Sequence, residues 1–339
     1  MFPYGVRIGS CVFLLITFFV GLIGNLLVCL AVRNSVSMRT PTNLILVNLA
    51  VADFLGCLVN MPIMCYTFWT DFQDKSIDAL GEVHFVLTVF IGFPICCCHV
   101  LLCIDRHDAI KSPFQRRINK NRIKKISLVV WAVSFATGIL TISLVLLVPT
   151  HWLTLREEKP HFIAGEILNG TGTFVILAIL SMMIYSSCVV KRGINSHNNN
   201  MMSAMGRATI DREMRITKVT TVLITAFTVT CLPWVFFRLL YDINGHQDEI
   251  SYAICYTFLF TSHAINPIVY AGLMRNFQRT MKQSLKYCLA KICCGMACTT
   301  GLGGRLEREQ GEGTSVKGLQ QSRNSLAAIQ PLDLENLNT

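Results

Sequence analysis

The hydrophobic pattern of the chain consists of long apolar runs separated by short polar segments. A helix that crosses a lipid bilayer needs roughly 20 mostly apolar residues, and seven runs reach about that length. They cover approximately Cys11–Val32, Leu44–Tyr66, Val83–Cys103, Ile126–Pro149, Gly172–Val190, Val219–Leu240 and Tyr252–Met274. We therefore predict an all-α membrane protein, a seven-transmembrane helix bundle.

The composition agrees with a membrane protein. The 339 residues are 52% hydrophobic and 15% charged, whereas a soluble domain has about 25% charged residues. Most of the 15 cysteines lie in apolar runs or in the C-terminal region. This placement favours small buried hydrophobic residues or lipid-anchor sites over a disulfide framework.

The positive charges indicate the orientation of the bundle. Nearly all of the 30 lysines and arginines follow the first, third and fifth spans or lie in the C-terminal region. The exceptions are Arg7, Lys75, Arg156, Lys159 and Arg238. Because cytoplasmic loops are enriched in lysine and arginine, we expect a plasma-membrane protein with an extracellular N-terminus and a cytoplasmic C-terminus. The net charge of +10 then reports topology, and we expect no nucleic-acid partner.

The regions outside the bundle also have distinct patterns. Residues 1–10 form a short extracellular segment, and residues 11–274 form the bundle. In residues 275–298, Phe277, Met281 and Leu285 recur at helical spacing among basic residues, which predicts a short amphipathic cytoplasmic eighth helix. The cysteines there are palmitoylation candidates: Cys288, Cys293, Cys294 and Cys298. Residues 299–339 are polar and lack aromatic residues, which predicts a disordered cytoplasmic tail.

Each span carries polar or aromatic residues that lipid-facing packing does not explain. They are Gly24-Asn25, Asn48-Leu49-Ala50-Val51-Ala52-Asp53, Asp105-Arg106-His107, Trp131, Tyr185, Phe227 with Cys231-Leu232-Pro233-Trp234, and Asn266-Pro267-Ile268-Val269-Tyr270. This set, in this order, resembles the rhodopsin-like (class A) G-protein-coupled receptors over roughly residues 20–280. The resemblance implies a receptor, and no enzyme, that passes a signal to heterotrimeric G proteins by moving its sixth helix.

The resemblance also assigns a switch at the cytoplasmic side. Arg106, flanked by Asp105, is expected to pair with Glu213 in the resting state, although Glu213 also fits a solvated charge at a helix end. Further switch and coupling residues are Phe114, Tyr185, Phe227, Pro233, Asn266, Pro267 and Tyr270. The basic loop that contains Phe114 suits a G-protein docking surface, lipid headgroups, or both. Arrestin and receptor kinases are the other cytoplasmic partners implied.

Asp53 is an acid in the middle of an apolar span, and such residues are functional candidates. We expect a polar network of Asn25, Asp53, Ser262, His263 and Asn266, which serves as a switch or as a structural hydrogen-bond node. The resemblance implies sodium as a candidate ion near Asp53. This sequence departs from that pattern, because Ile95 stands where a hydroxyl ligand is expected and His263 replaces a small residue.

The extracellular half excludes some ligands. The seventh span has no lysine for retinal, so we expect no covalent cofactor, and the third span has no acid for an amine. Gly81 stands where the family has the disulfide cysteine. Ligand-binding candidates are His84, Thr88, Glu166, Trp234, Arg238 and Tyr241. Arg238 suits an anionic ligand group or a side chain that snorkels to the interface. The ligand is left open as a small molecule, a lipid or a peptide.

Two alternatives to a signalling receptor remain from the sequence. A seven-span transporter or channel would need a charged pathway or inverted repeats, and neither is visible. A receptor-like scaffold, non-signalling or constitutively active, is suggested by Cys231 at the position of the family's aromatic switch and by the missing disulfide cysteine.

Overall fold

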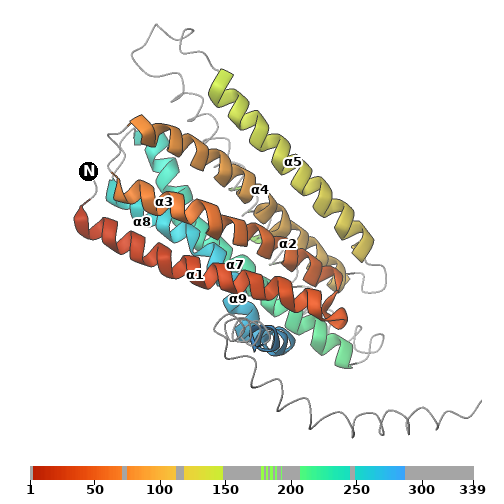
Figure 1. The fold of residues 1–339 in the computed structure, drawn as a ribbon. Coiled ribbons are helices and arrows are strands. Elements are labelled where there is room, and N and C mark those ends of the chain that lie inside the picture. Colours follow the sequence, from red (N-terminus) through yellow and green to blue (C-terminus); the bar gives the residue numbers. More distant parts are fainter. Residues whose placement is uncertain are drawn as a thin grey trace, which may run out of the picture. The chain divides into compact units, whose positions relative to one another are not determined.

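The computed structural model describes residues 3–70, 75–111, 118–147, 207–244 and 249–286, with positions 177, 178, 181, 184, 185, 188 and 192 between them. The chain divides into two compact units, Met1–Ser284 and Leu285–Thr339, and the packing described below lies within the first. Over the described ranges the regular elements are helices (Figure 1). The segments long and apolar enough to cross a membrane are Tyr4–Asn34, Pro41–Trp69, Val83–Ala109, Lys120–Ser143 and Asp211–Leu240. They correspond to the first four predicted spans and to the sixth.

The second span begins at a capped N-terminus. The Thr40 side chain accepts a hydrogen bond from the Asn43 N–H at 3.2 Å, and Pro41 takes the first helical position, where no N–H is needed. Helix α2 (Pro41–Leu55), the π-helical η2 (Gly56–Asn60) and α3 (Met61–Trp69) then follow without interruption. A π-helical turn inside a helix is frequent at functional positions, and this one begins three residues after Asp53.

Several helices are longer than the apolar runs that predicted them. These are α1 (Tyr4–Asn34), α4 (Lys75–Lys111), α5 (Lys120–Leu147) and α7 (Arg207–Asn244); the short 3-10 element η1 (Val36–Met38) follows α1. The predicted bounds were too short because hydropathy marks only the residues suited to lipid. The backbone hydrogen bonds of a helix continue into the polar flanks.

The seventh span differs from the single helix that was predicted. It consists of α8 (Glu249–Phe260) and α9 (Ser262–Leu273), interrupted at Thr261. The Thr261 N–H and hydroxyl both donate to the Phe258 carbonyl, at 3.1 and 2.6 Å. A hydroxyl that bonds to the preceding turn competes with the regular helical ladder, and the irregular turn lies just before His263. Residues 275–286 are helical as well, and Phe277 is buried with its ring 5.4 Å from that of Tyr270.

The helices pack side by side around a buried apolar core. Helix α1 contacts α2 and α9, α2 contacts α4, and α4 contacts α5 (Figure 1). By contrast, large apolar side chains on α1 and α5 are not covered by protein, for example Ile16 and Phe135. Contiguous apolar surface of this kind is disfavoured in water but is solvated by lipid tails. The described helices are therefore built for a bilayer.

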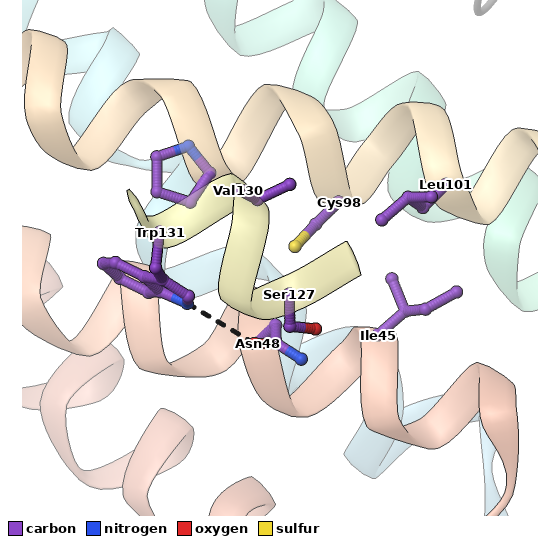
Figure 2. A pocket seen from close by; sticks show the side chains of 8 residues that line it. Ile45, Asn48, Cys98, Leu101, Ser127, Val130 and Trp131 are labelled. Atoms are coloured by element: carbon purple, nitrogen blue, oxygen red, sulfur yellow. Dashed lines mark hydrogen bonds between the residues drawn. The ribbon is translucent and has the colours of Figure 1, made fainter. Parts of the chain in front are cut away.

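Pro94 shapes the packing of the third and fourth spans. A proline inside a helix leaves the carbonyl four residues earlier without its N–H donor, and for Pro94 this is the Phe90 carbonyl, which accepts a hydrogen bond from Ser134 of α5 instead. Pro94 also lines the pocket in Figure 2, between α2, α4 and α5. Beside this pocket, Trp131 donates to Asn48 at 3.4 Å. Its lining is otherwise largely apolar, so we assign it to helix packing.

Candidate functional site

The arginine cluster, which we define as Thr42, Asp105, Arg106 and Glu213, lies where α2, α4 and α7 meet. Arg106 is 2% exposed and is fully enclosed by its partners. Its guanidinium donates to Glu213 at 3.1 Å, to Thr42 at 2.9 Å and to Asp105 through Nε at 3.1 Å, with a further bond from Nη2 to Asp105. One cation thus holds two carboxylates and a hydroxyl from three helices.

Thr42 completes this cluster and was not identified from the sequence. Its hydroxyl donates to Asp105 at 2.8 Å while accepting from Arg106. The other oxygen of Asp105, Oδ1, is buried without a hydrogen-bond partner in the described part of the chain. No sequence signal separates Thr42 from other threonines, because its role depends on the packing of α2 against α4. The structure does bring Arg106 and Glu213 together, across α4 and α7.

The aspartate cluster, which we define as Asn25, Asp53, His263 and Asn266, lies deeper in the bundle. His263 Nδ1 is 2.9 Å from Asp53 Oδ1, and Asn266 donates to Asp53 Oδ2 at 2.6 Å. An ionised carboxylate only accepts hydrogen bonds, so Nδ1 is the donor to Asp53 in its charged form. Asp53 itself is 1% exposed. Both carboxylate oxygens are therefore joined to α9.

Asn25 connects this cluster to α1 through a carbonyl that a proline frees. Pro267 lies inside α9 and cannot donate to the His263 carbonyl. Asn25 donates to that carbonyl instead, at 2.8 Å. Gly24 permits the approach, because a Cβ at this position would come within 2.6–2.7 Å of the Pro267 ring. The geometry thus explains both residues: Gly24 leaves room for the Pro267 ring, and Asn25 satisfies the His263 carbonyl.

The aspartate cluster does not fit a bound sodium ion. Hard cations prefer several oxygen ligands, but Asp53 is engaged by nitrogen donors from two side chains. Ile95 is buried and supplies no oxygen. Ser262, also expected in this network, is buried at the start of α9, and its part in the network stays a prediction. His263, the next residue, is directed at the carboxylate.

The aromatic cluster, which we define as His84, Trp234, Tyr252, Tyr256 and Phe260, lies toward the end of the bundle opposite Arg106. The rings of Trp234 and Tyr256 are 4.4 Å apart, and Tyr252 stacks on Tyr256 at 5.4 Å. His84 of α4 contacts Tyr256 at 5.9 Å and Phe260 at 6.1 Å. The series of ring contacts continues from Phe260 to His263, whose ring centroids are 5.6 Å apart. It therefore joins the aromatic cluster to the aspartate cluster.

Arg238 lies one helical turn beyond Trp234 on α7 and is buried, with 8% of its surface exposed. Its burial argues against a side chain that only snorkels into solvent. Thr88 lies one turn from His84 and donates to the His84 carbonyl at 2.8 Å. These residues and the aromatic cluster place four of the six ligand-binding candidates, His84, Thr88, Trp234 and Arg238, near one end of the bundle.

Between the two polar clusters lies a buried histidine that sequence reasoning missed. His99 of α4 is 0% exposed, bonds to the Ile95 carbonyl through Nδ1 at 2.9 Å, and stacks on Phe227 at 4.2 Å. In the sequence, the signal for His99 is that it is a histidine within the apolar run of the third span. Tyr270 is also fully buried, and in the described structure its hydroxyl has no hydrogen-bond partner.

Most of the remaining expected site residues lie outside the part of the chain that the structure describes. Tyr185 is described and is largely uncovered by protein, but most of the fifth span around it lies outside the described residues. The remaining ones lie outside the described side chains: Phe114, Glu166, Tyr241, Cys288, Cys293, Cys294 and Cys298. Pro233 is inside α7. Over the described ranges, no side chain is recorded as donating to the Val229 carbonyl that Pro233 frees.

Comparison with known proteins gives a consistent result. Residues 24–270 match the family model of the 7 transmembrane receptor (rhodopsin family). The chain is 27% identical to human neuromedin-U receptor 2, over 77% of this chain and 68% of that protein. It is 25% identical to human neuromedin-U receptor 1, over 84% and 74%, and 25% identical to neuropeptide Y receptor type 1 of Xenopus laevis, over 79% and 78%. The chain therefore belongs to the rhodopsin-like (class A) seven-transmembrane receptors and is a receptor that signals to heterotrimeric G proteins.

Proposed function

We propose that this receptor recognises an extracellular peptide, and that Arg238 with the aromatic cluster forms part of the recognition site. The proposal includes a plasma-membrane location with the N-terminus outside and the C-terminus in the cytoplasm, as the distribution of basic residues favours. The observation that carries it is that Arg238 is buried one helical turn from Trp234 of the aromatic cluster, at the opposite end of α7 from Glu213.

The chemistry of this region suits a peptide. A peptide offers carbonyl and carboxylate oxygens, and arginine binds such groups with several directed donors. The flat rings of Trp234 and Tyr252 provide apolar contact area with a polar edge. Within the described residues, His84 Nε2, Asn60 Oδ1 and Thr257 Oγ1 are buried without hydrogen-bond partners. Buried polar atoms are nearly always satisfied, so peptide groups or water would supply their partners.

The similarity to other receptors supports a peptide over a small molecule or a lipid. Two of the relatives are neuromedin-U receptors and one is a neuropeptide Y receptor. At 25–27% identity, this supports the class of ligand and leaves the particular peptide open.

Replacement of Arg238 tests the recognition site. After a peptide library has identified an agonist, Arg238→Gln should lower its potency about ten-fold or more, because a hydrogen bond to a charged group contributes roughly 1.5–3 kcal/mol. Arg7→Gln is the matched control. It removes a positive charge from the same end of the bundle, at a residue that donates to the Trp69 carbonyl and is no part of the proposed recognition site. A change of less than two-fold for Arg238→Gln, at equal surface expression, would refute the role of Arg238. An agonist set made up only of lipids or small molecules would refute the peptide class.

At the cytoplasmic side, the arginine cluster would hold the resting state, and the active state would separate α7 from α4 to admit the G protein. Pro233 lies inside α7, where it removes a backbone hydrogen bond, and this movement would occur about that position. The chain acts as a signal transducer in this proposal and not as an enzyme. Palmitoylation of the C-terminal cysteines, and phosphorylation followed by arrestin binding, belong to the proposal as well. Mass spectrometry of receptor from cells, with and without agonist, tests these modifications.

A further inference from the structure

The aspartate cluster differs from an ion site in a way that suggests a replacement for the ion. Asp53 has its two carboxylate oxygens occupied by His263 at 2.9 Å and Asn266 at 2.6 Å. Each oxygen keeps a second lone-pair site, so a cation at this carboxylate would have to fit beside these two donors. Asn25 Oδ1 is buried and has no hydrogen-bond partner in the described part of the chain. A hard cation takes several oxygen ligands, whereas the groups directed at Asp53 here are nitrogen donors.

The backbone around His263 is shaped to receive its imidazole. A Cβ on Gly56 would lie 2.7 Å from Cε1, 2.9 Å from Nε2 and 3.0 Å from Nδ1 of the ring. Gly56 begins the π-helical turn η2, three residues after Asp53. The Phe260 ring lies 5.6 Å from the imidazole on another side. The imidazole therefore fills a space that Gly56, Phe260 and Asp53 enclose.

The backbone of His263 is fixed independently of its side chain. Its carbonyl, freed by Pro267, accepts from Asn25 at 2.8 Å. The irregular turn at Thr261 lies two residues earlier. The side chain and the carbonyl of one residue thus connect α9 to both α2 and α1, which is a task that an ion bridging the same helices would otherwise perform.

We propose that the His263 imidazole takes the place of a cation in this receptor, so that α2 and α9 are joined by a permanent side-chain contact and sodium does not bind at Asp53. A bound ion dissociates and so makes a receptor sensitive to the salt around it. An imidazole that belongs to the chain does not dissociate. The stability of this receptor should then be the same in sodium and in other monovalent cations.

Thermal unfolding of the purified full-length receptor tests the exclusion of sodium without reference to signalling. In equal concentrations of sodium or potassium chloride, the unmodified receptor should unfold at the same temperature. The double variant His263→Ser with Ile95→Ser removes the imidazole beside Asp53 and supplies hydroxyls at the two positions where this sequence departs from the family's sodium pattern. It should gain a sodium-specific rise of about 2 °C or more, and adding Asp53→Asn should remove that rise.

A second comparison tests whether Gly56 serves the imidazole. Gly56→Ala should lower the unfolding temperature by about 3 °C or more in the unmodified receptor but by less than about 1 °C in the His263→Ser background, because the clash requires the ring. Gly92→Ala is the matched control, since a Cβ there meets nothing within 4 Å, and alanine is otherwise favoured over glycine in a helix.

Three results would overturn the proposal. One is a sodium-specific stabilisation of the unmodified receptor that Asp53→Asn abolishes, because sodium would then bind beside His263. Another is a folded double variant with no response to sodium, since the imidazole would then not be what excludes the ion. The last is an equal effect of Gly56→Ala in both backgrounds, which would separate the glycine from the imidazole.

Discussion

Replacing Glu213 by alanine is expected to raise the activity of the receptor in the absence of agonist. Glu213 on α7 accepts from Arg106 on α4 at 3.1 Å, and this ion pair joins the two helices whose separation would open the cytoplasmic side. The substitution removes the partner on α7 only. Arg106 keeps its bonds to Asp105 and Thr42, so its charge is not left unpaired in the resting state.

The burial of the pair sets the size of the effect. The Arg106 side chain is 2% exposed and that of Glu213 is 12% exposed, so solvent screening is weaker than for a surface pair of about 0.2–1 kcal/mol. A hydrogen bond to a charged group contributes roughly 1.5–3 kcal/mol. Because Arg106 keeps two other partners, we expect Glu213→Ala to destabilise the resting state by about 1.4–2 kcal/mol relative to the active state. While the active fraction is small, this raises it about ten- to thirty-fold.

Agonist-free guanine-nucleotide exchange on purified G protein, in membranes with equal amounts of receptor, measures this change directly. Asp211→Ala is the matched control, because it removes the same charge from an exposed position two residues earlier on α7. Glu213→Gln should fall between alanine and the unmodified receptor, since it keeps an acceptor oxygen and loses the charge. Arg106→Ala should reduce agonist-driven exchange, because the active state also needs the arginine.

Two outcomes would contradict this role of the Arg106–Glu213 pair. If Glu213→Ala leaves basal exchange unchanged in a system where the same receptor responds to agonist, the pair does not hold the resting state. If Asp211→Ala raises basal exchange as much as Glu213→Ala does, the cause is the charge of this helix end and not the contact with Arg106.

Two further substitutions test the polar clusters. Thr42→Val removes a hydroxyl that bridges Asp105 and Arg106 and should raise basal exchange about two- to ten-fold, from a loss of about 0.5–1.5 kcal/mol; unchanged exchange would mean that Thr42 does not stabilise the resting arginine. Asp53→Asn replaces one carboxylate oxygen with an NH2 group, so one of the two acceptor oxygens that face His263 and Asn266 is lost. It should weaken agonist-driven exchange at matched surface level, and an unchanged response would limit Asp53 to a structural role.

The sequence determined the membrane class of the protein and the approximate place of its spans. A bilayer imposes the same demand on every spanning helix, a run of apolar residues of similar length, so hydropathy located the first four spans and the sixth, which are long apolar helices in the structure. The ordered motifs identified the receptor class, which the family comparison confirmed. The sequence also predicted a pairing of Arg106 with Glu213 through the resemblance, and the structure places these residues at 3.1 Å.

Only the tertiary structure decided which side chains meet between helices. The sequence placed both Ser262 and His263 in the network around Asp53, and the packing of α9 against α2 brings the His263 imidazole to 2.9 Å from the carboxylate. It gave no reason to select Thr42, whose role follows from the rotation of α2 relative to α4. Hydropathy indicates which segment of a helix lies in the bilayer, because it averages over many residues. The rotation of each helix about its axis depends on a few close contacts, such as that of Gly56 with the imidazole, and those exist only once the helices have packed.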